Sequence, residues 1–303
     1  MAASPALGAQ GAQLNVKKTC REAHRDDLGA QLGLANGYFY DPGGTVTNDI
    51  PRRKVAFCLY LDGANRGDAE AQLRAAFMAE LGLGGAAPDP KLAAHWYERA
   101  ALQGNLIAQK AMARVMMNGL GRARDPVAAV DWWRRAAEGG DLQAQLNMSG
   151  FYQRGDIVPK SEQQATYWCE RAANNGDLTA QFDLGRHFHH GYGRPIDLQQ
   201  ARKWYKIAAD RGWAPAKANL GLMYALAEGG PRDDKQAQHY LEQAAALKDP
   251  IGLYGLGWLY QQGRLGRTRA ERKTKAIQLF QEAARLGNPD ARIALSQLGA
   301  PIN

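Results

Sequence analysis

The sequence is poor in the residues and motifs that carry chemistry. Its 303 residues include four serines, and no stretch reads G-x-S-x-G, S-x-x-K, H-E-x-x-H or C-x-x-C or forms a phosphate-cradling glycine loop. These absences disfavour the enzymes that depend on such motifs. We therefore predict no catalytic, cofactor-binding or metal-binding residues, no cofactor and no small-molecule substrate.

Long hydrophobic runs are missing as well. The longest apolar stretches are far too short to cross a bilayer, so we expect a soluble protein with no membrane span. The first residues, MAASPALGAQGAQ, have no basic segment followed by a hydrophobic one and so hold no intact secretion signal. They do read like the small-residue stretch that follows a cleavage site. The compartment stays open, with the periplasm favoured over the cytoplasm.

What the sequence has in abundance is internal repetition. A bulky side chain recurs at intervals of 37, 36, 36, 36, 36 and 39 residues, at Leu59, Trp96, Trp132, Trp168, Trp204, Tyr240 and Leu279. Alanine follows four and five places later in nearly every unit, and glycine follows eight places later, with Lys248 the exception. Alanine favours helix and close approach between helices, and glycine can adopt the left-handed conformation that ends a helix. The strict period indicates that the bulky residues form a core rather than ligand boxes.

Two further positions complete the unit. Seventeen places after the bulky position the residue is always small, at Ala76, Ala113, Ser149, Gly185, Gly221, Gly257 and Ser296. Seven places before it stands an N-cap residue, at Asp89, Asp125, Ser161, Asp197 and Asp233. Each unit is therefore predicted to be two capped helices. The first helices are expected at 69–81, 105–118, 142–154, 178–190, 214–227 and 250–262, and the second helices at 89–102, 125–138, 161–174, 197–210, 233–246 and 271–285.

The patterns W-Y-x-x-A-A-x-x-G, A-Q-x-x-L-G-x-x-Y and G-x-G-x-x-x-D recur along the chain. Together they resemble the Sel-one-like repeat (SLR) family, a branch of the tetratricopeptide-like α-solenoids. The resemblance implies an all-α fold, a right-handed α-solenoid of about seven helix-turn-helix repeats plus a terminal helix. The expected organisation is a tail or cap at 1–26, one solenoid domain at 27–299 and a tail at 300–303. Within the domain we expect an atypical first unit at 27–65 with a long loop, regular units at 66–263 and a basic last unit at 264–299.

The cysteines and the charge distribution leave alternatives open. Cys20, Cys58 and Cys169 are either buried free thiols, or Cys20 and Cys58 are bridged, since they lie 38 residues apart, close to one period. The net charge of +8 is concentrated near the C-terminal end, where RLGRTRAERKTK (264–275) supplies six cations. Such a local excess favours an acidic partner or plain solubility over a nucleic-acid groove along the whole chain.

One histidine cluster, HFHHGYGR at 187–194, could be imagined as a surface Zn or Ni site. His187 and His190 share a helical face and His189 lies beside them. No cysteine or carboxylate completes a tetrahedral set nearby in the sequence, and Phe188 occupies a core position. We therefore expect these histidines to flank the core rather than to bind a metal.

Because repeated residues build the scaffold, binding should depend on the residues that vary between units. In tetratricopeptide-like stacking the first helices line the concave surface, and residues two to three places off the packing stripe should face it. These candidate partner-binding residues mix aromatic side chains with arginine, as protein-binding surfaces do. They are Phe77, Glu80, Lys110, Arg114, Met117, Gln153, Phe182, Arg186, His189, Leu222, Tyr254, Trp258 and Gln261.

The resemblance implies a non-enzymatic protein-protein interaction module. Similar SLR proteins serve as periplasmic immunity proteins that neutralise phospholipase effectors of the type VI secretion system, and this is the most specific function that we predict. The alternative is a scaffold or adaptor in bacterial signalling, motility or polysaccharide export. A metal-dependent or β-lactam-directed enzyme is disfavoured, because the paired cysteines of the β-lactam-binding SLR proteins are missing. The expected partner is another protein, with an acidic surface or as an effector enzyme, and not a nucleic acid.

Overall fold

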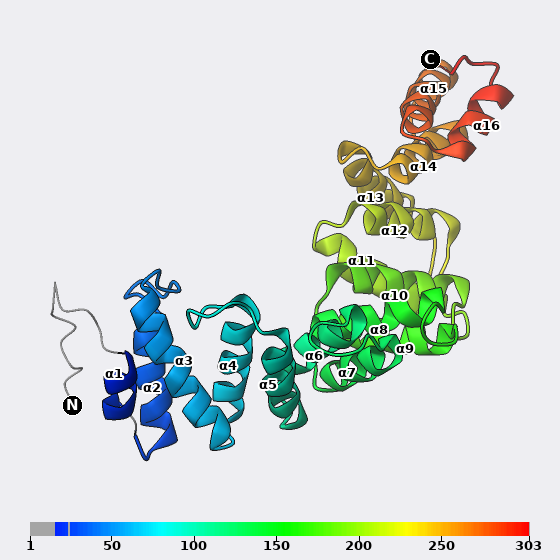
Figure 1. Cartoon of the computed structure of the whole chain (residues 1–303). Coiled ribbons are helices and arrows are strands. Elements are labelled where there is room, and N and C mark those ends of the chain that lie inside the picture. The colour runs from blue at the N-terminus through cyan, green and yellow to red at the C-terminus, as the bar shows by residue number, and fades with distance from the viewer. Residues whose placement is uncertain (1–15, 24, 303) are drawn as a thin grey trace. The chain divides into compact units, whose positions relative to one another are not determined.

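The computed structural model describes residues 16–23 and 25–302, which form sixteen α-helices and no β-strand (Figure 1). The helices are α1 (Val16–Ala23), α2 (Leu28–Phe39), α3 (Ile50–Asn65), α4 (Ala69–Leu81), α5 (Pro90–Leu102), α6 (Leu106–Asn118), α7 (Pro126–Glu138), α8 (Leu142–Arg154), α9 (Glu162–Asn174), α10 (Leu178–His190), α11 (Leu198–Asp210), α12 (Ala214–Leu226), α13 (Asp234–Ala246), α14 (Pro250–Gln261), α15 (Arg269–Arg285) and α16 (Pro289–Gln297). The chain forms two compact units, Met1–Ala144 and Gln145–Asn303. Within the described residues, no helix combines the length and the apolar character needed to span a bilayer. The prediction of an all-α solenoid of helix-turn-helix repeats is confirmed.

The predicted helix bounds agree with the structure within about one residue, apart from the start of α15, which begins at Arg269 and not at residue 271. The N-cap predictions are confirmed at all five positions. For example, Asp89 accepts a hydrogen bond from the Leu92 amide at 3.0 Å, and Ser161 accepts one from the Gln164 amide at 3.3 Å. Most first helices are capped too, as Asn105 caps α6 by accepting from the Ala108 amide.

The turn between the second helix of one unit and the first helix of the next depends on a left-handed residue. Gly104, at φ 87°, and its counterpart Gly176, also at φ 87°, adopt the predicted conformation. Lys248 takes the same place with φ 57°. A residue with a Cβ is strained in this region, so this turn carries a local cost that glycine avoids in the other repeats.

The small position, seventeen places on, is where the two helices of a unit touch. A Cβ added to Gly185 would lie 2.6 Å from the Tyr205 ring, and one added to Gly221 would lie 2.7 Å from Cγ of Leu241. At Ser149 the hydroxyl donates to the carbonyl of Ala165 at 2.9 Å. The small residues thus allow the close helix packing that their spacing predicts.

The bulky position is largely a core position. Trp96, Trp132 and Trp168 are buried, each beneath an arginine three places later, as Arg135 lies 4.7 Å above the Trp132 ring. Trp204 departs from the prediction, because it is half-buried. In its unit the neighbouring Tyr205 is the fully buried side chain.

A buried glutamine joins consecutive helices in several units. The Nε2 groups of Gln72, Gln109 and Gln181 each donate to the carbonyl eight residues earlier, at 3.2 Å. The side-chain oxygen of Gln72 accepts a hydrogen bond from the side chain of Gln103 at 2.8 Å. The residue equivalent to Gln103 in the next unit is Gly139, which has no side chain, and Oε1 of Gln109 is accordingly left without a partner.

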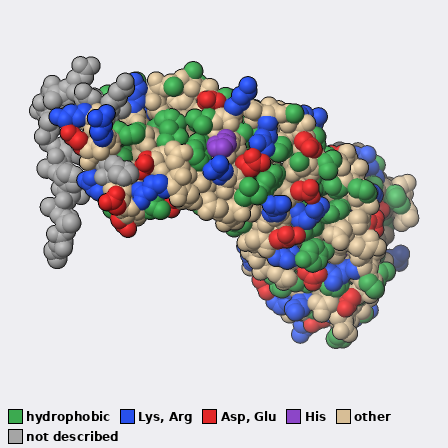
Figure 2. Space-filling view, turned by 60° about the horizontal axis from the view of Figure 1, so that its bottom comes forward, with side chains coloured by type: hydrophobic (Ala, Val, Ile, Leu, Met, Phe, Trp, Pro, Cys, Tyr) green, Lys and Arg blue, Asp and Glu red, His purple; other side chains and the backbone are tan. Residues whose placement is uncertain are grey.

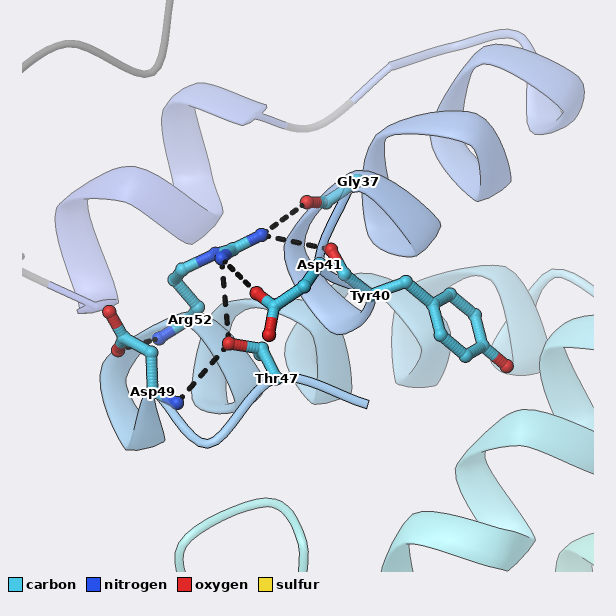
Figure 3. A network of polar contacts seen from close by, with 6 residues as sticks. All are labelled: Gly37, Tyr40, Asp41, Thr47, Asp49 and Arg52. Atoms are coloured by element: carbon cyan, nitrogen blue, oxygen red, sulfur yellow. Dashed lines mark hydrogen bonds and ion pairs between the residues drawn. The ribbon is translucent and has the colours of Figure 1, made fainter. Parts of the chain in front are cut away.

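The first repeat differs from the later repeats in the length of the loop between its two helices, which has ten residues, 40–49, between α2 and α3. The Arg52 guanidinium holds this loop, as Figure 3 shows, by donating to Oδ1 of Asp41 at 2.9 Å and to the carbonyls of Gly37 and Tyr40 at 2.9 and 3.0 Å. A single backbone bridge between Tyr40 and Val46 closes the loop. These contacts fix the positions of Tyr40 and Val46 in the loop.

The N-terminal helix α1 is tied to the first unit by a disulfide between Cys20 and Cys58, whose Cα atoms lie 6.3 Å apart. Of the two alternatives for these cysteines, the bridged one therefore applies. Cys169 is free and buried, and burial raises the pKa of its thiol to about 12. Such a thiol is unreactive near neutral pH. The first fifteen residues of the predicted tail lie outside the described residues.

Candidate partner-binding groove

None of the thirteen candidate residues is fully buried, and five of them, Phe77, Arg114, Gln153, Arg186 and Gln261, are exposed. The structure divides them between the two compact units of the chain, each of which contains several repeats. The first unit holds Phe77, Glu80, Lys110, Arg114 and Met117, and the second holds Gln153, Phe182, Arg186, His189, Leu222, Tyr254, Trp258 and Gln261.

The five candidates of the first unit line a single groove of about 710 Å³. Phe77 and Glu80 stand three places apart on α4, and Lys110, Arg114 and Met117 stand four and three places apart on α6. These spacings place each set on one face of its helix. These five of the thirteen predicted residues therefore lie around one cavity.

Most of the residues that make this groove apolar were not predicted from the sequence. Its other apolar and aromatic lining comes from three elements of the unit besides α4 and α6, namely the loop 40–49, α5 and α7. Val46 is 37% exposed, Phe77 36% and Ile107 61%, so the groove presents apolar surface to solvent. The missed lining residues are Tyr40, Val46, Leu73, Tyr97, Ile107, Ala111 and Trp133, besides the polar Arg74 and Asn118.

A hydrogen-bonded charge pair crosses the groove from α6 to α4. Arg114 donates to Oε2 of Glu80 at 2.8 Å, and the hydroxyl of Tyr97 donates to the same oxygen at 2.8 Å. The hydrogen bond from Arg114 lowers the pKa of Glu80, and burial together with the neighbouring carboxylate raises the pKa of Tyr97. The three side chains are thus fixed as carboxylate, guanidinium and phenol at neutral pH.

The other cations of the groove are held in place as well. Lys110 forms an ion pair with Asp141 at 2.7 Å. Arg74 bonds Glu70 at 2.7 Å and donates to the hydroxyl of Tyr40 at 2.9 Å, which connects α4 to the loop. Because every cation has a carboxylate beside it, the groove is close to neutral. The groove therefore suits a segment with apolar side chains, and the paired charged side chains at the groove could form hydrogen bonds with the polar groups of that segment.

In the second unit, Gln153 and Arg186 line a smaller polar pocket of about 290 Å³ that also includes His187. Nδ1 of His187 lies 2.7 Å from the hydroxyl of Thr166. Burial lowers the pKa of His187 to about 4, with contributions from nearby arginines. The imidazole is therefore neutral near pH 7.

The histidine cluster separates in the structure. His187 faces Thr166, whereas His189 lies 3.1 Å from Oε2 of Glu228 and stacks on His190 at 4.7 Å between ring centroids. In the described part of the chain, no three His, Cys, Asp or Glu side chains come together as a metal-ligand set.

The remaining candidates are divided between packing and exposure. Phe182 packs against the Tyr205 ring at 5.7 Å, and Leu222 belongs to the apolar cluster around Leu241. Both therefore serve the scaffold. Three others line a small depression of about 250 Å³ between α14 and α16, namely Tyr254, Trp258 and Gln261. On the face drawn in Figure 2, cationic and acidic side chains are interspersed with hydrophobic ones, in keeping with the many local ion pairs.

Pairs of capped helices, repeated at a fixed period and joined by left-handed turns, define the α-solenoids built from helix-turn-helix repeats. The Sel1 repeat model matches residues 29–68, 69–105, 106–141, 142–177, 178–213, 214–249 and 250–288. The chain belongs to the Sel1 repeat family. Sel1 repeats are typically a non-catalytic protein-interaction fold.

Solved structures agree with this assignment. The chain is similar to a protective antigen of uropathogenic Escherichia coli that displays an SLR fold, with 27% identity, a TM-score of 0.63 and coverage of 96% of this chain. It spans 62% of the length of that antigen. It is also similar to a Sel1 repeat protein from Oxalobacter formigenes, with 25% identity, a TM-score of 0.63 and coverage of 95% of this chain and 82% of that one. No curated protein matches the chain.

Proposed function

We propose that the protein is a non-enzymatic binding module whose groove in the first unit holds an apolar segment of a protein partner. The observation that carries the proposal is the convergence of Phe77, Lys110, Arg114 and Met117 on one groove of about 710 Å³. A cavity of this size accepts several side chains of a partner. Its solvent-exposed apolar lining would be covered when the partner binds.

The groove also lies where the repeats differ. One wall consists of Tyr40 and Val46, which belong to the ten-residue loop of the first repeat, whereas the corresponding loops of the later repeats have seven or eight residues. Arg52, which is not one of the residues that line the groove, holds the loop through its hydrogen bonds to Asp41 and to the carbonyls of Gly37 and Tyr40. The wall is therefore preformed, so a partner would lose little free energy in ordering it.

Within this module class, the more specific function that we propose is that of a periplasmic immunity protein, which would cover and neutralise a phospholipase effector of the type VI secretion system. The disulfide between Cys20 and Cys58 supports an oxidising compartment, because such bridges persist there and are rare in the bacterial cytoplasm. A scaffold in signalling, motility or polysaccharide export would use the same groove.

The experiment compares two groove variants with a matched surface variant. Ile107→Asp and Phe77→Asp each place a carboxylate on the apolar lining, whereas Val127→Asp makes the same change on α7 at a side chain that is 60% exposed and outside the groove. Affinity-tagged wild type and variants would be used to isolate partners from cells of the source, followed by mass spectrometry and titration of the partner found.

We expect each groove variant to weaken the partner at least about thirtyfold, which corresponds to about 2 kcal/mol at a central contact. Val127→Asp should bind as the wild type does. Equal binding by all three variants would remove the groove from the function. A lipase as the specific partner would support the immunity role, and a signalling or export component would support the scaffold.

A further inference from the structure

The last repeat contains three more residues than the regular units, since its bulky position follows the previous one after 39 rather than 36 residues. The insertion lengthens the second helix at its N-terminal end. Helix α15 has 17 residues, whereas its counterpart α13 has 13. The added turn is not needed to build a repeat, because the other units pack without it.

The added turn and the loop before it carry an excess of positive charge. Residues 267–275 contain five cations and one carboxylate, a net charge of +4. The stretches that start twelve places before the bulky position in the five preceding units carry net charges between −1 and +1, over 84–92, 120–128, 156–164, 192–200 and 228–236. The excess therefore belongs to the insertion and not to the repeat.

These cations have no internal partner among the described residues. The side chains of Arg267, Arg269, Lys273 and Lys275 are exposed, and none of them forms an ion pair or a hydrogen bond there. The one carboxylate, Glu271, accepts a hydrogen bond from the backbone amide of Arg267 at 3.0 Å. It therefore completes the helix cap rather than neutralising a cation.

Arg264, which the sequence places in the same basic run, has a different role. Its guanidinium donates to the carbonyl of Ala225 at 2.8 Å, lies 3.6 Å from Oδ1 of Asp234 and lies 5.0 Å from the Trp258 ring. Arg264 thus anchors the start of the loop. The free cations begin only at Arg267, beyond that anchor.

We propose that the basic turn, residues 267–275, is a second docking surface that binds an acidic segment of a protein partner. Residues 269 to 275 rise about 9 Å along the helix, a length that about three residues of an extended peptide cover. A short run of consecutive glutamates or aspartates therefore matches the length over which these cations are spread. The surface lies in the second unit and does not depend on the groove of the first unit.

The composition of the turn favours an acidic protein segment over other polyanions. The stretch RTRAERKTK has no aromatic side chain on which a base could stack and no large apolar side chain that could enter a bilayer interface. Its five cations fall short of the six to ten phosphate contacts, roughly, with which proteins commonly grip duplex DNA. A surface that offers only exposed cations is suited to bind the carboxylates of a flexible acidic segment.

The test measures binding of a short glutamate-rich peptide to the full chain at low salt and near 0.15 M salt. The patch variant changes Arg267, Arg269, Lys273 and Lys275 together to Gln. A control variant makes the same change in net charge at four scattered exposed cations that form no ion pair in the described structure, Lys91, Lys203, Lys235 and Arg292. Duplex DNA and vesicles with anionic lipids serve as competing probes.

We expect the wild type to bind the peptide at low salt, the patch variant to bind it at least about tenfold more weakly, and the control variant to retain most of the affinity. Ile107→Asp should bind the peptide as the wild type does, which separates this proposal from that for the groove. Three outcomes would overturn the proposal: no binding by the wild type, equal loss in both variants, or tighter binding of DNA or vesicles than of the peptide.

Discussion

Gly221→Leu tests the packing rule on which the repeat depends. A Cβ at this position would lie 2.7 Å from Cγ of Leu241, 3.1 Å from its Cδ2 and 3.2 Å from the carbonyl oxygen of Ala237. The backbone oxygen cannot move without shifting α13, and leucine adds three carbons beyond the Cβ. We therefore expect the variant to lose about 3 kcal/mol of unfolding free energy, the upper part of the usual range for overpacking.

The assay is urea unfolding followed by circular dichroism, with Gly33→Ala as the matched control. Gly33 is also a helix glycine, but nothing lies within 4 Å of an added Cβ. Alanine should therefore stabilise α2 by about 0.5–1 kcal/mol through helix propensity alone. Opposite signs for the two variants are expected. Unchanged stability of Gly221→Leu would refute the argument that the small residues exist to admit the neighbouring helix.

Four further predictions concern single features of the fold. Lys248→Gly should stabilise the protein by about 0.5–1 kcal/mol in the same assay, because it removes a side chain from a left-handed position at φ 57°. Reducing the disulfide between Cys20 and Cys58, which closes a 38-residue separation, should cost about 2–4 kcal/mol in urea unfolding with and without reductant, and no change would show that the bridge constrains nothing. Arg52→Met should speed hydrogen exchange in the loop 40–49 and weaken partner binding. Hydrogen exchange as slow as in the wild type would show that another contact holds the loop. Because burial lowers the pKa of His187 from 6.5 to about 4, only the unfolded chain takes up this proton between those values, so stability should fall as pH falls from about 6.5 to about 4, and His187→Leu should remove that part of the slope.

The helices could be predicted from the sequence because their ends are decided locally. An aspartate or serine that caps a helix and a glycine that ends one act within a few residues, so Asp89 and Gly104 mark their turns without knowledge of the rest of the fold. The start of α15 was predicted two residues late because Thr268 and Glu271 form a cap outside the repeat pattern. Local signals were present there too, but the insertion moved them out of register.

The groove could be predicted only in part. Phe77 and Arg114 were found because their helical register sets them beside the packing stripe. The wall formed by Tyr40 and Val46 could not be found, because the loop owes its conformation to the hydrogen bonds of Arg52 with residues eleven to fifteen places away. Such contacts leave no periodic trace in a sequence. The exposure of Trp204 could not be predicted from the sequence either. Its periodic position predicts a buried side chain, but Trp204 is half-buried and the neighbouring Tyr205 is the buried one.

The most direct test of the proposed function is hydroxyl-radical footprinting of the chain with and without its protein partner. Phe77 and Met117 line the groove, and Tyr167, which is 47% exposed on α9 in the second unit, serves as an internal reference. The groove proposal predicts that the partner slows oxidation of Phe77 and Met117 severalfold and leaves Tyr167 unchanged. Oxidation of Phe77 and Met117 at the same rate with and without the bound partner would contradict it.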